Sequence, residues 1–210
     1  MNILIVGASR GIGLQLLLQA LTAGHTVTAL ARHPEHIVAS HDRLRKVSCD
    51  ILDERCLTAA LAGQDAVVCA IGKKTPWEQR PDFFSRGTET LLRAMRAAGV
   101  RRLVCVTGIG AGDSRGHGGL LYDRLFRPLL LKGIYDDKDR QEALIRASDT
   151  DWTLVRPGFL TNGPVTGNYK VLTDLTGVTA GRISRADVAH FMLQELASGR
   201  YVGRSPLLTS

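Results

Sequence analysis

The sequence predicts a single α/β domain built on a doubly wound, mostly parallel sheet. Short apolar runs alternate with amphipathic helical patterns from the first residue to about Pro157. Buried strands joined in this way by helices are typical of a parallel sheet covered on both faces. A glycine-rich turn follows the first apolar run, and glycines stand where helices should end. A chain of 210 residues is long enough for one full core and fits one domain better than two.

Residues that commonly start or stop helices support the predicted elements. Gly24 and Gly99 suit helix C-termini, Asp53 and Ser184 suit N-caps, and Pro81 suits a first helical turn. In chain order we expect strand 2–6, helix 11–23, strand 26–32, a short helix or loop from residue 34, strand 45–51, helix 54–61, strand 66–70, helix 81–98, strand 102–107, a helical region from about 120 to 147, strand 152–156, strand 168–172 and helix 185–196. Residues 157–210 are expected to form a small C-terminal extension on the substrate side.

Composition and charge restrict the compartment and the partners. No apolar run approaches the roughly 20 residues of a membrane span, and the N-terminus lacks a basic region and a small-residue cleavage site. We therefore expect a cytoplasmic protein without a membrane partner. The net charge is +7, but the basic residues are scattered and not interleaved with aromatic ones, so nucleic acid is an unlikely partner. A scattered positive excess instead favours anionic ligands.

The cysteines show no spacing that would indicate a metal site or a disulfide framework. Cys49, Cys56, Cys69 and Cys105 include no CxxC pair, and several lie in or beside apolar strand patterns, where a free cysteine acts as a small hydrophobic residue. We expect neither a bound metal nor a disulfide.

The glycine-rich turn Gly7-Ala8-Ser9-Arg10-Gly11-Ile12-Gly13 carries the strongest functional signal. Gly7 permits a tight turn, Gly11 lets the backbone approach a diphosphate, and Gly13 allows close packing of helix on strand. Backbone N–H groups and the positive end of the helix dipole then face the anion. The strand–turn–helix context predicts a dinucleotide site of the Rossmann type.

The spacing GxxxGxG resembles that of the short-chain dehydrogenases/reductases. An NAD site places a carboxylate at the end of the second strand, whereas a 2′-phosphate needs a cation. Here Arg32 stands at that strand end and Arg10 in the turn, so two guanidinium groups are available to hold a 2′-phosphate. The alternative is that both are ordinary surface arginines. We predict NADP(H) as the cofactor.

The resemblance also assigns positions further along the chain. In that family the residue matching Asp50 hydrogen-bonds the adenine amino group, and the backbone matching 70–72 passes beneath the adenine ribose. The segments WTLVRPG at 152–158 and RISRADVA at 182–189 are similar to atypical members, among them the NmrA-like and flavin reductase/biliverdin reductase B groups. The implied cofactor positions are Gly7, Ser9, Arg10, Gly11, Ile12, Gly13, Arg32, Asp50, Ile51, Ala70, Ile71, Gly72, Thr107, Pro157 and Gly158.

The catalytic set of the resembling family is incomplete in this sequence. No YxxxK motif is present, and Tyr135 and Lys138 are three residues apart, on one helical face but out of register. Lys138 lies where atypical relatives place their lysine; the alternative is a surface ion pair with Glu142 at i+4. Thr107 offers a hydroxyl where the family has a serine. The candidate catalytic residues are Thr107, Tyr135 and Lys138.

A glycine-rich loop follows the predicted strand 102–107, at the edge of the sheet where ligands bind in such folds. Its polar residues are either substrate contacts or solvated loop side chains; they are Asp113, Ser114, Arg115 and His117.

These patterns predict an NADP(H)-binding oxidoreductase that transfers a hydride to a small carbonyl, flavin or quinone-like acceptor. Such an acceptor needs little acid catalysis, because the cofactor supplies the reactive hydride. The alternative is a non-catalytic NADP-binding sensor of the NmrA-like type. The expected partner is a small-molecule substrate, and the sequence leaves a homodimer open.

Overall fold

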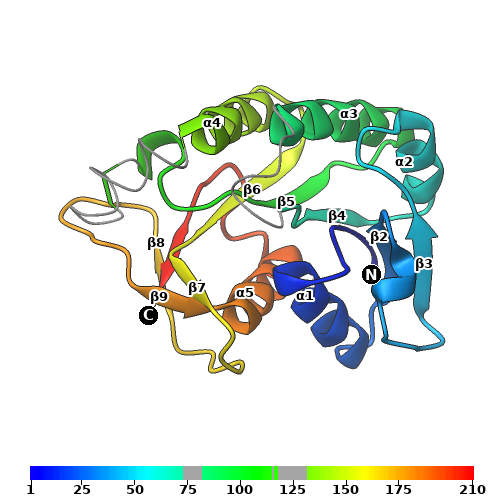
Figure 1. Ribbon diagram of the computed structural model, residues 1–210, viewed down its shortest axis with the longest axis horizontal. Helices are drawn as coiled ribbons and strands as arrows, with labels where there is room; N and C mark the ends of the chain where they lie inside the picture. The colour runs from blue at the N-terminus through cyan, green and yellow to red at the C-terminus, as the bar shows by residue number, and fades with distance from the viewer. Residues whose placement is uncertain (73–81, 115, 118–131) are drawn as a thin grey trace.

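The computed structural model describes residues 1–72, 82–114, 116–117 and 132–210. Its main sheet has eight strands in the order β3-β2-β1-β4-β5-β6-β10-β8 (Figure 1). Every neighbouring pair is parallel except β10 and β8. The strands are β1 (Asn2–Val6), β2 (Thr26–Ala31), β3 (Leu44–Ser48), β4 (Ala66–Cys69), β5 (Arg102–Val106), β6 (Asp151–Pro157), β8 (Lys170–Leu172) and β10 (Leu207–Thr209). The predicted doubly wound α/β domain is confirmed.

Helices cover both faces of the sheet (Figure 1). On one face lie α1 (Gly11–Thr22) and α5 (Arg185–Ser198), and on the other α2 (Glu54–Leu61), α3 (Phe83–Ala98) and α4 (Lys132–Arg146). Strand β1 is apolar on both sides because it serves both layers: Ile3 and Ile5 join the cluster under α1 and α5, whereas Leu4 and Val6 join the opposite cluster. No described helix is long and apolar enough to cross a membrane.

The predicted helix-capping and helix-ending residues are confirmed where the structure describes them. The Asp53 carboxylate accepts a hydrogen bond from the Cys56 backbone N–H at 3.0 Å, and the Ser184 hydroxyl accepts one from the Asp187 N–H at 2.8 Å. Gly24 and Gly99 have the positive φ values of +87° and +71° that helix ends favour. Pro81 and the first part of the predicted helical region 120–147 lie outside the described residues.

Three short strands were missed, and several predicted strands extend past the observed ones. Strands β7 (Phe159–Thr161) and β9 (Arg182–Ser184) pair in parallel as a small second sheet, and β10 extends the main sheet beside β6. Three residues are too few to show a period, so only pairing with distant segments defines these strands. Strand β3 ends at Ser48 and not at residue 51, which leaves Asp50 in the following turn.

The N-terminus of α3 is capped by another helix. Asp82 makes no capping bond with its side chain. Instead the Asp137 carboxylate of α4 accepts from the Phe84 and Ser85 backbone N–H groups at 2.8 and 3.1 Å, and from the Ser85 hydroxyl. A carboxylate at a helix N-terminus is also favoured by the helix dipole. This contact fixes the position of α4 on the sheet, and α4 carries two of the candidate catalytic residues.

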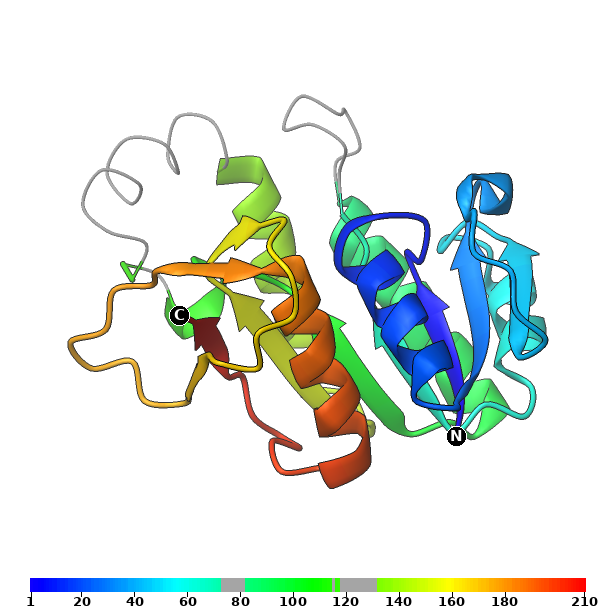
Figure 2. The same cartoon turned by 90° about the horizontal axis from the view of Figure 1, so that it is seen from below.

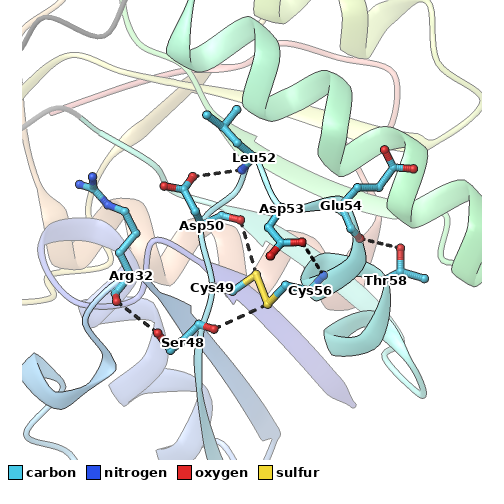
Figure 3. The surroundings of a disulfide bond; sticks show 9 residues. All are labelled: Arg32, Ser48, Cys49, Asp50, Leu52, Asp53, Glu54, Cys56 and Thr58. Carbon is cyan, nitrogen blue, oxygen red and sulfur yellow. Dashed lines mark hydrogen bonds between the residues drawn. A yellow bond between two sulfur atoms is a disulfide. The ribbon is translucent and has the colours of Figure 1, made fainter.

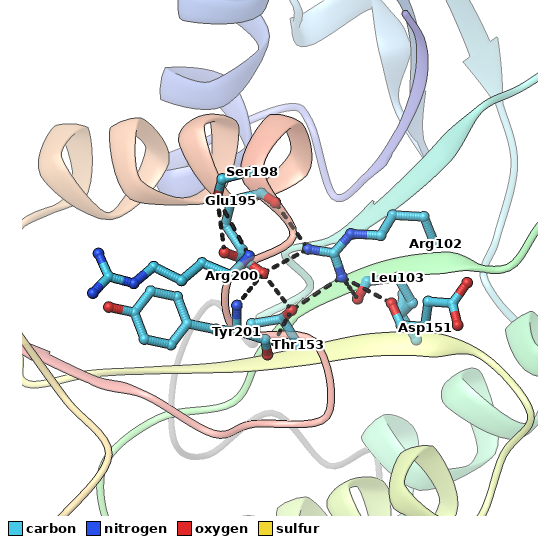
Figure 4. A network of polar contacts seen from close by, with 8 residues as sticks. All are labelled: Arg102, Leu103, Asp151, Thr153, Glu195, Ser198, Arg200 and Tyr201. Carbon is cyan, nitrogen blue, oxygen red and sulfur yellow. Dashed lines mark hydrogen bonds and ion pairs between the residues drawn. The ribbon is translucent and has the colours of Figure 1, made fainter.

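A buried ion pair joins α5 to the amino ends of β5 and β6 (Figure 4). Arg102 Nη2 lies 2.8 Å from Glu195 Oε1, and the Glu195 side chain is 1% exposed. The same carboxylate accepts from the Thr153 hydroxyl and the Tyr201 N–H, both at 3.0 Å. Arg102 Nη1 donates to the Asp151 carbonyl at 2.8 Å. This network lies at the opposite end of the strands from Thr107.

Replacing Glu195 by alanine should strongly destabilise the protein. The change leaves the Arg102 guanidinium buried without its counter-charge, and breaking a buried pair in this way costs about 3 kcal/mol or more. Urea denaturation measures the loss in free energy of unfolding. Arg101→Ala is the matched control, because it removes the exposed Arg101–Asp151 pair next to the network and should have a much smaller effect. Equal effects of the two variants would contradict the assignment.

Candidate functional site

The glycine turn is pressed against the end of β4. A Cβ on Gly7 would lie 2.8 Å from the Ala70 carbonyl oxygen, and one on Gly13 would lie 2.2 Å from the Gly7 carbonyl oxygen. Both positions therefore require glycine. Helix α1 starts at Gly11, its first turn has no acidic residue, and the Arg10 side chain does not cap it. Its N-terminal N–H groups are thus suited to bind an anion.

A cleft of about 1210 Å³ opens at the carboxyl ends of the strands, from the glycine turn to α4. Ligands bind at this edge in open α/β sheets. The predicted site residues are all found along it except Gly13, which lies behind the turn and serves packing. The predicted residues that line the cleft are Gly7, Ser9, Arg10, Gly11, Ile12, Arg32, Asp50, Ile51, Ala70, Ile71, Gly72, Thr107, Tyr135, Lys138, Pro157 and Gly158.

One end of the cleft carries the two predicted arginines. Arg32 directly follows β2, and Arg10 Nη2 donates to the Gly72 carbonyl at 3.4 Å. Asp50 Oδ1 accepts from the Leu52 N–H at 3.1 Å within the turn after β3 (Figure 3). This bond holds the carboxylate in the turn beside the cleft.

Cys49 and Cys56 form a disulfide beside this end of the cleft, which corrects the expectation of no disulfide (Figure 3). Their Cα atoms are 6.1 Å apart, and Cys49 lines the cleft. The turn after β3 folds back into α2, whose first turn is capped by Asp53, and this reversal brings the two sulfur atoms together. The spacing of seven residues matches no motif, so only the folded chain reveals the pair.

The other end of the cleft rests on a buried ion pair between α4 and β6. Arg156 Nη2 lies 2.6 Å from Glu142 Oε2, and Arg156 Nε donates to Glu142 Oε1 at 3.0 Å. The Thr107 hydroxyl donates to the same Oε1 at 2.7 Å. Since an ionised carboxylate only accepts hydrogen bonds, the Thr107 proton is directed away from the cleft. The hydroxyl therefore offers the cleft lone pairs, not a proton.

Lys138 does not form the alternative surface pair with Glu142, because that carboxylate is buried against Arg156. Lys138 instead lines the cleft, with Nζ 4.2 Å from the centre of the Phe84 ring. Desolvation by burial lowers the pKa of Lys138 from its ordinary value, although the Glu142 and Asp137 carboxylates act to raise it. The Tyr135 ring lies beside Gly110. Tyr135 and Lys138 of α4 both line the cleft.

Several lining residues were not predicted from the sequence. Phe159 and Leu160 of β7 line the cleft and are 38% and 37% exposed. Asn162 and Arg185 line it near the glycine turn. Strand β7 is too short to be recognised from its sequence, and an arginine at the start of a helix matches no binding motif.

The glycine-rich loop after β5 has mainly structural contacts where it is described. Ser114 is buried and bonds to the Gly110 N–H and the Ala111 carbonyl, while His117 Nδ1 contacts the Val178 carbonyl at 2.8 Å. Neither residue lines the cleft. Arg115 and the side chain of Asp113 lie outside the described part.

Known proteins share both the sequence and the fold. The family described as NAD(P)H-binding matches residues 7–198. An uncharacterized chloroplastic protein of Arabidopsis thaliana is 32% identical over 93% of this chain and 71% of its own length. An uncharacterized sugar epimerase of Bacillus subtilis is 26% identical over 93% and 88%. The structure of ChuY, an anaerobillin reductase of Escherichia coli O157:H7, superposes with a TM-score of 0.83 at 21% identity, covering 100% and 97% of the two chains.

The family match begins at the first glycine of the turn and ends within α5, so it spans the cleft from end to end. The chain is a Rossmann-type domain that belongs to the NAD(P)H-binding family.

Proposed function

We propose that this protein binds NADP(H) and transfers a hydride from it to a planar acceptor of the flavin, quinone or conjugated carbonyl class. One observation carries the proposal. A single cleft joins an anion-binding helix start and two arginines at one end to an apolar region with one half-buried lysine at the other. ChuY, an anaerobillin reductase with the same fold, agrees with this chemistry.

Each end of the cleft has a distinct part in binding. The start of α1 would hold the diphosphate, and the Arg10 and Arg32 guanidinium groups would hold a 2′-phosphate, for which neutral or acidic residues are unsuited. Phe84, Phe159 and Leu160 offer apolar surface for the nicotinamide and a flat acceptor. Such a surface also excludes water from the transfer.

The bound cofactor would supply the hydride, and the protein must manage the proton. Thr107 cannot provide it, since its hydroxyl proton is bonded to Glu142. The Thr107 oxygen can instead accept a hydrogen bond from an amide or hydroxyl group and so orient a ligand. Lys138, as an ammonium group, can stabilise the negative charge that the hydride brings to the acceptor and can then donate a proton to it.

A non-catalytic NADP sensor is the second candidate. The missing YxxxK pair and the bonded Thr107 proton favour it, because both weaken the usual acid catalysis of such folds. Net NADPH oxidation separates the candidates. An epimerase, as the Bacillus subtilis relative is named, would return the hydride to its substrate and show no net oxidation.

The cofactor preference should follow Arg32. Arg32→Asp replaces a phosphate-binding cation by a carboxylate, so we expect NADPH to bind about 10- to 100-fold more weakly and NADH nearly as before. Fluorescence titration with both nucleotides measures the two affinities. Arg45→Asp makes the same charge change at an exposed β3 position outside the cleft and serves as the control. Equal losses for NADPH and NADH would refute the 2′-phosphate assignment.

The rate of NADPH oxidation should depend on the charge of Lys138. With free flavin or a naphthoquinone as acceptor, kcat should fall as the pH rises, because the lowered pKa of Lys138 means that the ammonium loses its proton earlier than an exposed lysine. Lys138→Met should lower kcat by about 10-fold or more at pH values where Lys138 carries its proton, and the difference from the wild type should shrink as the pH rises. Lys138→Arg should remove the alkaline fall, since arginine stays charged.

Lys170→Met serves as the control, because Lys170 is exposed and lies outside the cleft. Tight NADPH binding without turnover of any acceptor would contradict the proposed reductase. An unchanged kcat for NADPH oxidation in Lys138→Met would show that Lys138 has no part in the reaction.

A further inference from the structure

Arg185, the first residue of α5, reaches over the glycine turn from the C-terminal part of the chain. Its Cδ and Nε atoms are 3.9 Å from the place that a Cβ on Gly11 would take. It lines the main cleft and also a hollow of about 120 Å³ beside Gly11 and Gln15. Figure 2 shows α1 and α5 side by side on the same face of the sheet, which explains how Arg185 meets the start of α1.

The Arg185 guanidinium is held at one edge by neutral groups. Nη1 donates to Asn162 Oδ1 at 2.7 Å and to the Thr161 carbonyl at 3.2 Å. Within the described part of the chain, Arg185 Nε and Nη2 make no hydrogen bond. No described carboxylate forms an ion pair with the Arg185 guanidinium. The nearby Asp187 carboxylate is already bonded to the Thr166 and Gly167 N–H groups and to the Ser184 hydroxyl.

Two positive groups thus lie close together, and none of the described carboxylates is bonded to either of them. The start of α1 carries the positive end of the helix dipole and has no acidic residue in its first turn. A half-buried guanidinium beside it is unfavourable unless an anion lies between them. The geometry differs from that of an ordinary surface arginine, which turns toward water or a carboxylate.

We propose that Arg185 is a ligand of the dinucleotide diphosphate and that it links this group to strand β7. The proposal rests on the proposed function, since it needs a dinucleotide in the cleft. The diphosphate carries negative charge on both phosphates and is common to NADH and NADPH. The free edge of a guanidinium can donate two hydrogen bonds to phosphate oxygens.

The link to β7 follows from the second edge of the same group. Thr161 ends β7, and Phe159 and Leu160 of that strand line the cleft. An Arg185 bonded at once to the diphosphate and to 161–162 would hold β7 in place over the cofactor. The same residue would then affect both the affinity for the nucleotide and the placement of the apolar surface.

The test compares Arg185→Gln with the wild type and with Arg32→Asp for both nucleotides. Arg185→Gln should lower the affinity for NADPH and for NADH by the same factor, about 10-fold for the loss of a charged phosphate contact. Arg32→Asp should lower the affinity for NADPH alone. Fluorescence titration at two salt concentrations gives the readout. The salt dependence of binding should be shallower in Arg185→Gln because one charge contact is gone.

Two further variants separate binding from folding. Arg182→Gln removes an exposed arginine of β9 outside the cleft and should bind both nucleotides as the wild type does. Asn162→Ala keeps the Arg185 charge but removes one of its hydrogen-bond acceptors. It should therefore lower the affinity for both nucleotides less than Arg185→Gln does. An unchanged melting temperature of each free variant shows that the fold is intact; Arg185→Lys, which keeps the charge, should recover part of the affinity.

The outcomes are distinct. If the wild type binds both nucleotides and Arg185→Gln binds them equally well, this inference is wrong while the proposed function stands. Loss of NADPH binding alone in Arg185→Gln would also overturn it, because Arg185 would then contact the 2′-phosphate. If the wild type binds neither nucleotide, the proposed function itself fails.

Discussion

The close packing of the glycine turn on the end of β4, and of α1 on that turn, is the constraint on which the rest of the structure depends. A side chain at Gly7 or Gly13 would overlap backbone atoms at 2.8 and 2.2 Å, so the turn can approach the sheet only with glycine at both places. This approach directs the first N–H groups of α1 into the cleft. It also sets where α5 packs beside α1, and therefore where Arg185 lies.

Two buried ion pairs fix the sheet at its opposite ends. Arg102 and Glu195 join α5 to the amino ends of β5 and β6, while Arg156 and Glu142 join α4 to β6 beside the cleft. Buried pairs contribute little net stability relative to apolar packing, because both charges lose their hydration. Here they define geometry: the Glu142 carboxylate determines the direction of the Thr107 hydroxyl, and so which chemistry that residue can perform.

The cleft is polarised along its length. Its cations Arg10, Arg32 and Arg185 lie near the glycine turn, whereas Phe84 packs against Lys138, and Phe159 and Leu160 add apolar lining. A ligand with a charged half and a flat, apolar half fits this change from cationic to apolar lining. The Cys49–Cys56 disulfide ties the turn that carries Asp50 to α2, which restrains the cleft wall next to Arg32.

The sequence by itself determined the features that depend on neighbouring residues. Strand β1, helix α2, the caps at Asp53 and Ser184 and the glycine turn follow from local periodicity and backbone freedom. The other predicted residues along the cleft came mainly from the family resemblance of short motifs, and all but Gly13 line it. Only the tertiary structure decided the strands β7, β9 and β10, the Cys49–Cys56 pair, the Glu142–Arg156 pair and the place of Arg185. Each depends on a contact between segments that the fold brings together, and such contacts leave no pattern in the local sequence.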